Sequence, residues 1–226
     1  MEYLYLGLHY SQEAYEDEIP KAKKFYTWWT STTAFLLKTS RFDILTFRGS
    51  QQPSDWIYNF SAIPIKYGPS WSHAGFSLAH KSVWSKIVPH LRPTVPLLIT
   101  GHSLGGALAE KSAEFTQGFK EVHLITFGKP NLKKKGQPTT LRHLKTQVSV
   151  VNGSDLVTLL PHFLFGPDEG QNLLYLANSG EVLWNPSDEF RREDRDILGE
   201  GVSDHLLPGY RSRVMSAGRV VLAGGF

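Results

Sequence analysis

Cysteine is absent from this chain of 226 residues. Without cysteine the fold can hold no disulfide, no thiolate metal site and no cysteine nucleophile. Long hydrophobic runs are also missing, because no stretch approaches the roughly 18 uninterrupted apolar residues that a membrane-spanning helix needs. We therefore expect no stable insertion into a membrane, and a core that is held together by side-chain packing alone.

A strong excess of charge of either sign is lacking too. The chain has 24 Lys and Arg against 21 Asp and Glu, a formal net charge of +3. Proteins that bind nucleic acids gather their cations on one face, whereas here the cations are scattered, apart from runs at 133–135 and 191–192. We interpret both runs as solvated loops, and we expect no nucleic-acid partner.

The first 17 residues have no basic region followed by an apolar run. That pattern marks a secretory signal peptide, so we predict none. The expectation is a soluble protein, cytoplasmic or host-associated, with export by another route left open.

The composition, 41% hydrophobic and 20% charged, is that of a globular protein, and the length suits a single domain over residues 1–226. Apolar runs indicate strands over 42–47, 95–100, 122–127 and 148–152, and a hairpin over 175–184 around Ser179-Gly180. Helical spacing predicts helices over 13–37, 77–91 and 104–115. This alternation favours an α/β fold with a mostly parallel sheet covered by helices on both faces. Reactive groups then belong at the carboxyl ends of the strands.

The strongest local motif is the segment Gly101-His102-Ser103-Leu104-Gly105-Gly106, placed between an apolar strand and a helix of small residues. A G-x-S-x-G sequence in that context is typical of a nucleophile elbow, a tight turn that presents the serine hydroxyl above the sheet. Glycines on either side remove side chains that would collide in such a turn. We predict Ser103 as the nucleophile of an α/β-hydrolase.

In this fold the acid and then the histidine follow the serine along the chain. The strand end at 148–152 places Asp155 where the acid belongs, and the polar loop before the last apolar segment holds His205. We predict Asp155 as the acid and His205 as the base. The weaker candidates for the base are His123, His143 and His162, and those for the acid are Asp168, Asp188, Asp194, Asp196 and Asp204.

With these residues identified, the chain resembles the class 3, fungal-type lipase family over roughly residues 30 to 210. The motifs that carry the resemblance are Phe47-Arg48-Gly49-Ser50 with Asp55-Trp56, His73-Ala74-Gly75-Phe76, Gly101 to Gly106, Phe127-Gly128-Lys129-Pro130, Asn152 to Asp155, and Asp204-His205. Lys129 departs from the pattern, since the family has a small residue there. The missing disulfides and signal peptide depart from its secreted fungal members.

The resemblance implies an oxyanion hole formed by Ser50, through its backbone N–H and hydroxyl, and by the backbone N–H of Leu104. It also implies a lid in the segment after Ser50. We expect Trp56, Ile57, Tyr58, Phe60 and His102 to contact the substrate or form this lid.

These residues predict a serine carboxylic-ester hydrolase, a lipase or esterase that cleaves acyl esters such as acylglycerols and that needs no cofactor. Its partners would be an ester or lipid substrate and, transiently, a lipid interface. A phospholipase A1 or a feruloyl-type aryl esterase is the alternative within the same chemistry. A hydrolase-fold binding module that has lost activity is the alternative outside it.

Overall fold

The computed structural model describes residues 2–50, 63–161, 163–167, 172–195 and 204–221. A central sheet of eight strands runs through it in the order β1-β2-β3-β6-β7-β9-β11-β12. The strands are β1 (Lys23–Thr27), β2 (Thr32–Lys38), β3 (Asp43–Phe47), β6 (Leu97–His102), β7 (Val122–Phe127), β9 (Thr146–Asn152), β11 (Asn172–Leu176) and β12 (Val182–Trp184). From β3 to β11 all neighbours are parallel, whereas β1, β2 and β12 are antiparallel to their neighbours.

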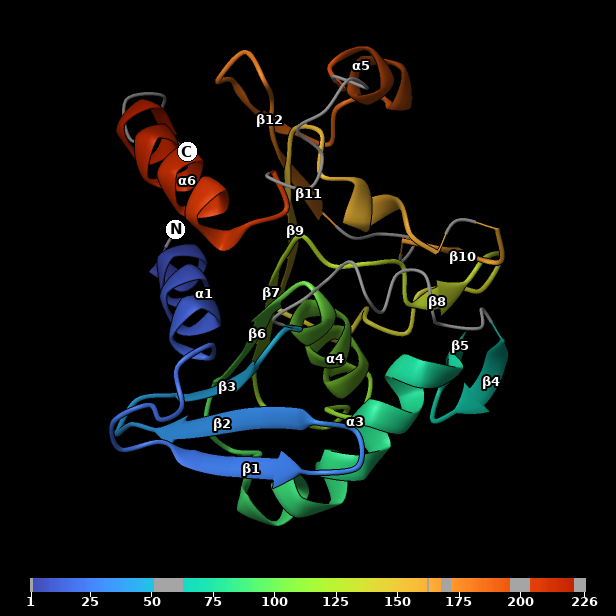
Figure 1. Cartoon of the computed structure of the whole chain (residues 1–226). Helices are drawn as coiled ribbons and strands as arrows, with labels where there is room; N and C mark the ends of the chain where they lie inside the picture. Colours follow the sequence, from blue (N-terminus) through green and yellow to red (C-terminus); the bar gives the residue numbers. More distant parts are fainter. Residues whose placement is uncertain (1, 51–62, 162, 168–171, 196–203, 222–226) are drawn as a thin grey trace.

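Helices cover both faces of this sheet (Figure 1). On one face lie α1 (Glu2–Glu13) and α6 (Leu207–Val221), and on the other α3 (Ala74–Ile87) and α4 (Leu104–Ala113). Leu8, Tyr210 and Val214 pack with Leu98 and Ile125 on the first face. The prediction of an α/β-hydrolase sheet covered on both sides is confirmed. That residues 1–226 form one domain stays a prediction.

The remaining elements lie at the carboxyl ends of the parallel strands or around the rim. A second, antiparallel sheet has the order β10-β8-β5-β4. Its strands are β4 (Pro64–Tyr67), β5 (Ser70–His73), β8 (Lys133–Lys134) and β10 (Phe165–Gly166), and the short helices are η1 (Val88–His90), η2 (Leu156–Leu159) and α5 (Asp188–Glu193). No helix of the described ranges is long and apolar enough to cross a membrane.

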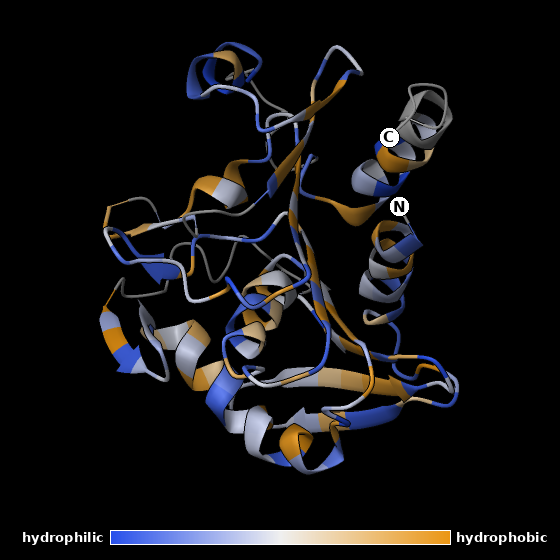
Figure 2. Ribbon diagram, turned by 180° about the vertical axis from the view of Figure 1, so that it is seen from behind, coloured by the Kyte–Doolittle hydropathy of each residue, from blue (hydrophilic) through white to orange (hydrophobic). Residues whose placement is uncertain are grey.

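The innermost strands β3, β6 and β7 consist entirely of buried residues. Because both faces of a parallel sheet are covered, such strands are continuous apolar runs, and Figure 2 shows hydrophobic residues along the middle of the sheet. The predicted strand at 122–127 is present with the same ends, and the other predicted strands and the helices at 77–91 and 104–115 are present with shifted ends. The hairpin is confirmed too, but its strands end at Leu176 and begin again at Val182, so its turn is longer than the predicted two residues.

The predicted helix over residues 13–37 is wrong. The helix α1 already ends at Glu13, and β1 and β2 form a hairpin in which Phe25 pairs with Ala34. The segment is rich in threonine and aromatic residues, which favour strands. Trp28 and Trp29 lie in the turn and are 79% and 56% exposed, so they do not join the buried stripe that helical spacing suggests.

Candidate active site

Ser103 lies where β6 ends and α4 begins, at the carboxyl edge of the sheet. Its backbone has φ 56° and ψ −130°, a conformation that a non-glycine residue rarely adopts. A side chain at Gly101 would overlap the backbone of Gly105, and one at Gly105 would overlap the backbone of Phe47. The two glycines therefore permit the close strand-to-helix turn that the motif predicts.

The structure brings together the three residues predicted from the sequence. The Oγ of Ser103 lies 2.8 Å from Nε2 of His205, and Nδ1 of His205 lies 2.9 and 3.0 Å from the two carboxylate oxygens of Asp155. All three side chains are buried. Because a carboxylate only accepts, Nδ1 carries the proton, which leaves Nε2 to accept the hydroxyl proton of Ser103.

Two further donors fix the carboxylate of Asp155. The backbone N–H of Val157 donates to Oδ1 at 2.9 Å, and the hydroxyl of Tyr210 donates to Oδ2 at 2.6 Å. The same hydroxyl accepts the backbone N–H of Asn152 at 3.1 Å. Tyr210 is fully buried, and burial together with the charge of Asp155 raises the pKa of its phenol well above the usual value. Tyr210 thus stays a neutral donor that positions the acid.

The rival histidines lie elsewhere. His123 is hydrogen bonded to Glu121 and Thr146 and stacks on Tyr3 at the far end of β7. His143 contacts Thr116 and the carbonyl of Ala113. His162 lies outside the described residues.

Among the rival acids, Asp204 accepts the backbone N–H of Ser154 at 3.0 Å, so it braces the loop that carries Asp155. Asp188 pairs with Arg191, and Asp194 accepts from Tyr175. Asp168 and Asp196 lie outside the described residues.

His102 takes a different place from the one predicted. Its Nδ1 lies 2.8 Å from the hydroxyl of Tyr15, and its Nε2 lies 2.7 Å from the backbone carbonyl of His205. Since a carbonyl only accepts, Nε2 is the protonated nitrogen and Tyr15 donates to Nδ1. The polar atoms of His102 therefore hold the backbone of His205 rather than facing a substrate. Burial and the neighbouring His205 lower the pKa of His102 to about 3.

Three buried histidines make the stability of the fold sensitive to acid. Burial lowers the pKa of His73 to about 4 and that of His102 to about 3, and burial and Lys111 lower the pKa of His80 well below its usual value. Above about pH 6.5 these groups are neutral both folded and unfolded. Below about pH 6.5 the unfolded chain binds protons that the folded chain does not bind. Stability is therefore lost as the pH falls from about 6.5 toward 4.

We expect calorimetric unfolding at pH 5 to take up about three protons, roughly two more than at pH 7, which lowers stability by up to about 4 kcal/mol per pH unit. The substitution His80→Phe should remove about one proton of this uptake. Unfolding at pH 5 without extra proton uptake would contradict the assignment.

The two residues predicted for the oxyanion hole line one cavity. This cavity has a volume of about 700 Å³, and its walls include Gly49, Ser50 and Leu104. Leu104 is the first residue of α4, and the first N–H groups of a helix have no helical carbonyl to bind. The role of both residues as oxyanion donors stays a proposal. The predicted substrate or lid residues Trp56, Ile57, Tyr58 and Phe60 lie outside the described residues.

Sequence reasoning missed Tyr15 and Tyr210. Tyr210 has a usable signal, because it lies on the first turns of the helix that begins just after His205. Tyr15 has none, since it lies in the turn after α1, far from the triad in the sequence.

The profile of the lipase (class 3) family matches residues 44–165, more than half of the chain. The chain belongs to the class 3 lipase family. Among curated proteins, the lipase of Rhizomucor miehei is 29% identical over 159 residues, covering 62% of this chain and 40% of that protein. A secreted mono- and diacylglycerol lipase of Gibberella zeae is 27% identical over 123 residues, 41% of this chain and 30% of that one. The chain thus spans 40% or less of the length of these relatives.

Solved structures agree on the fold of this lipase family member. The Rhizomucor miehei triacylglyceride lipase superposes with a TM-score of 0.71 at 21% identity, covering 91% of this chain and 92% of that one. A triacylglycerol lipase described as having a serine protease triad at its catalytic centre superposes with a TM-score of 0.68 at 23% identity, covering 83% and 84%.

Proposed function

We propose that this chain is a serine carboxylic-ester hydrolase, a lipase or esterase that cleaves acyl esters such as acylglycerols through an acyl-enzyme on Ser103. The observation that carries the proposal is the buried chain of hydrogen bonds from Ser103 through His205 to Asp155, with Ser103 on a strained turn. Nucleophile, base and orienting acid in this order are what acyl transfer requires. The named activities of the related lipases support it.

We propose one role for each group. His205 takes the hydroxyl proton through Nε2 as Ser103 attacks the ester carbonyl, and it then gives that proton to the leaving alcohol. Asp155 keeps the proton of the ring on Nδ1 and stabilises the imidazolium that forms. The backbone N–H groups of Ser50 and Leu104, together with the hydroxyl of Ser50, stabilise the oxyanion. Water that is activated by His205 then hydrolyses the acyl-enzyme. These groups complete the catalytic cycle without a metal or an organic cofactor.

The acyl group fits the cavity beside Leu104. Its walls include the apolar or aromatic side chains of Tyr26, Trp29, Leu78 and Leu108, beside several serine and threonine residues. Tyr26, Trp29 and Leu78 are 51%, 56% and 47% exposed, so they stand at the mouth of the cavity. Exposed apolar side chains around a pocket mark a site of contact with an apolar partner. We assign this rim to transient contact with a lipid surface.

The substitution Trp29→Ala should change the preference for acyl chain length. We expect kcat/KM for p-nitrophenyl esters of eight or more carbons to fall about 10- to 100-fold, since an aromatic contact of this size contributes about 1.5–3 kcal/mol. Activity on the acetate and butyrate should remain. The measurement is hydrolysis of p-nitrophenyl esters of increasing chain length, with wild type and variant side by side.

The matched control is Trp71→Ala, because Trp71 is 44% exposed but does not line the cavity. If Trp29→Ala left the dependence of activity on acyl chain length unchanged, the assignment of this cavity as the acyl site would be wrong. A wild type that hydrolyses no ester in the series, nor acylglycerols, would contradict the proposed function itself.

A further inference from the structure

A second cavity, separate from the one that Ser50 and Leu104 line, gathers cations from distant parts of the chain. Its volume is about 410 Å³, and its cationic lining consists of Lys129, Lys135, Arg191, Arg192 and Arg195. None of the triad residues and no wall residue of the first cavity lines it. Figure 2 shows that α5, which supplies Arg191 and Arg192, is mostly hydrophilic. Basic residues that belong to separate charge runs in the sequence therefore line one cavity.

The charges around this cavity are not balanced by the described residues that line it. Asp188 is the one carboxylate in the described lining, and it pairs with Arg191. Lys135, Arg192 and Arg195 form no ion pair with a described carboxylate. Burial lowers the pKa of the Arg195 guanidinium, and so do the charges of Arg191 and Arg192, whereas Tyr175 and Asp188 act in the opposite direction. Like charges this close together favour an anion between them.

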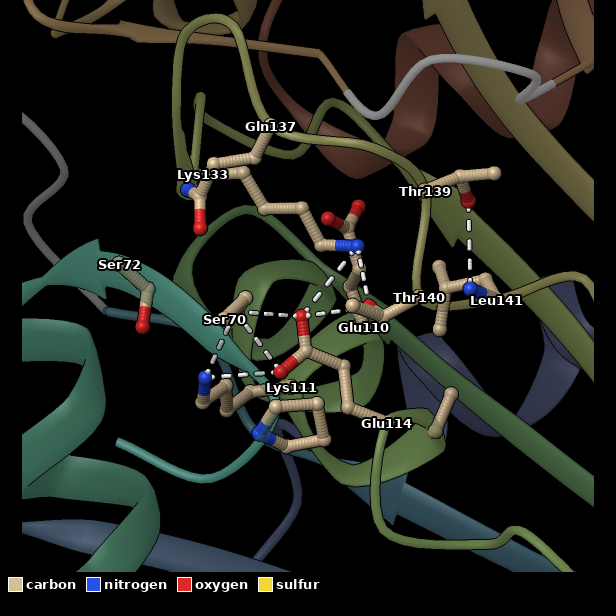
Figure 3. A network of polar contacts seen from close by, with 12 residues as sticks. Ser70, Ser72, Glu110, Lys111, Glu114, Lys133, Gln137, Thr139, Thr140 and Leu141 are labelled. Atoms are coloured by element: carbon tan, nitrogen blue, oxygen red, sulfur yellow. Dashed lines mark hydrogen bonds and ion pairs between the residues drawn. The ribbon is translucent and has the colours of Figure 1, made fainter. Parts of the chain in front are cut away.

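Lys129 connects the cavity with a buried ion-pair cluster. Its Nζ lies 2.8 Å from the carboxylate of Glu110, while Glu114 binds both Lys111, at 2.8 Å, and Lys133, at 3.2 Å. Figure 3 shows the cluster between α4, β5 and β8. Because two carboxylates are shared among three ammonium groups, the cluster does not offset the charges of Arg192 and Arg195.

One donor at the cavity lacks an acceptor. The Nε–H of Arg191 is buried, and none of the described groups accepts it. Buried donors are nearly always hydrogen bonded, so this N–H group is expected to have an acceptor. The planar fork of a guanidinium matches the oxygens of a phosphate, which can accept two parallel hydrogen bonds.

We propose that this cavity binds a phosphate group, either free or carried by a small organic phosphate or a phospholipid headgroup. Arg191, Arg192 and Arg195 would bind its oxygens, Lys135 would add charge, and Phe165, Pro167 and Leu173 form an apolar wall beside them.

The site lies next to the loop that carries Asp155, not at the ester bond that is cleaved. Thr158, which also lines the cavity, donates to the backbone carbonyl of Asp155 at 2.7 Å. The proposal is therefore independent of ester hydrolysis, and it can fail or succeed separately from the proposed function.

Calorimetric titration of the whole chain at constant ionic strength tests the proposal, with inorganic phosphate and glycerol 3-phosphate as probes and acetate as the comparison. We expect the phosphates to bind and acetate to bind at least tenfold more weakly. The double substitution Arg192→Gln, Arg195→Gln should weaken phosphate binding tenfold or more, because charge-assisted hydrogen bonds are lost. Lys135→Gln supplies an independent variant with a smaller loss in the same direction.

The control is Arg41→Gln, an exposed arginine between β2 and β3, toward the other edge of the sheet. Binding of soluble phosphates indicates a free ligand, whereas binding only to vesicles that contain phosphatidic acid indicates the lipid headgroup. Absence of binding in both arms would overturn the proposal, and so would equal effects of the cavity variants and Arg41→Gln.

Discussion

Replacing Ser103 with alanine is expected to lower kcat for ester hydrolysis by a factor of about 10⁵ to 10⁶, which is the loss typical of removing the nucleophile of a triad. Without the hydroxyl no acyl-enzyme forms, although the cavity and the oxyanion donors stay in place. Hydrolysis of p-nitrophenyl butyrate, followed at enzyme concentrations high enough to detect the residual rate, measures the effect.

The control for this substitution is Ser112→Ala on the same helix. Ser112 is also buried, and its hydroxyl is hydrogen bonded to His80 and to the carbonyl of Leu108, away from the triad. It should keep nearly full activity. If Ser103→Ala retained a tenth of the wild-type rate, the nucleophile would have to be another residue.

The substitution Asp155→Asn is expected to lower kcat by about 10⁴ with little change in KM. Asp155 accepts hydrogen bonds from His205, Tyr210 and Val157. An amide has one accepting oxygen and one donating NH₂ group, so it cannot accept all three. When the NH₂ group faces Nδ1, the imidazole proton moves to Nε2, which can then no longer accept the proton of Ser103.

The substitution Tyr210→Phe tests how much the positioning of Asp155 matters while the charge of Asp155 is kept. The phenylalanine keeps the ring packing but removes the donor to Asp155, and we expect kcat to fall about tenfold with KM unchanged, the scale of one hydrogen bond to a charged group. Asp204→Asn completes the set as the test of the neighbouring carboxylate. A small effect in Asp155→Asn beside a large one in Asp204→Asn would reassign the acid.

The triad is predictable from sequence because its members follow local rules. Ser103 lies in a strand-glycine-helix context that few other turns share, and Asp155 comes directly after a parallel strand. Since parallel strands end at the same edge of a sheet, positions far apart in the sequence meet there. The fixed order of the three residues placed the base after Ser103, and the polar loop before the last apolar segment favoured His205 over the other histidines.

Other features depend on contacts that no local pattern encodes. Helical spacing over 13–37 is misleading, because Phe25 and Phe35 become buried through strand alternation and pairing with the sheet. His102 looks like a substrate contact in the elbow motif, yet the hydroxyl of Tyr15 and the carbonyl of His205 engage both its nitrogens. These partners come from the two ends of the chain.

The basic cavity illustrates the same limit. Lys129 and Lys135 follow β7, whereas Arg192 lies on α5 and Arg195 just after it. The packing of α5 against β9 and β11 brings them together. Charge runs considered one at a time therefore indicate solvated loops, and their shared hollow emerges only in three dimensions.

Labelling with a fluorophosphonate followed by peptide mass spectrometry tests the central claim most directly, because the reagent forms a bond only with an activated serine. We expect one phosphonyl adduct per chain, on the peptide that contains Ser103, with labelling abolished in Ser103→Ala and strongly slowed in His205→Gln. Labelling of another residue, or ester hydrolysis that continues while Ser103 stays unmodified, would contradict the account.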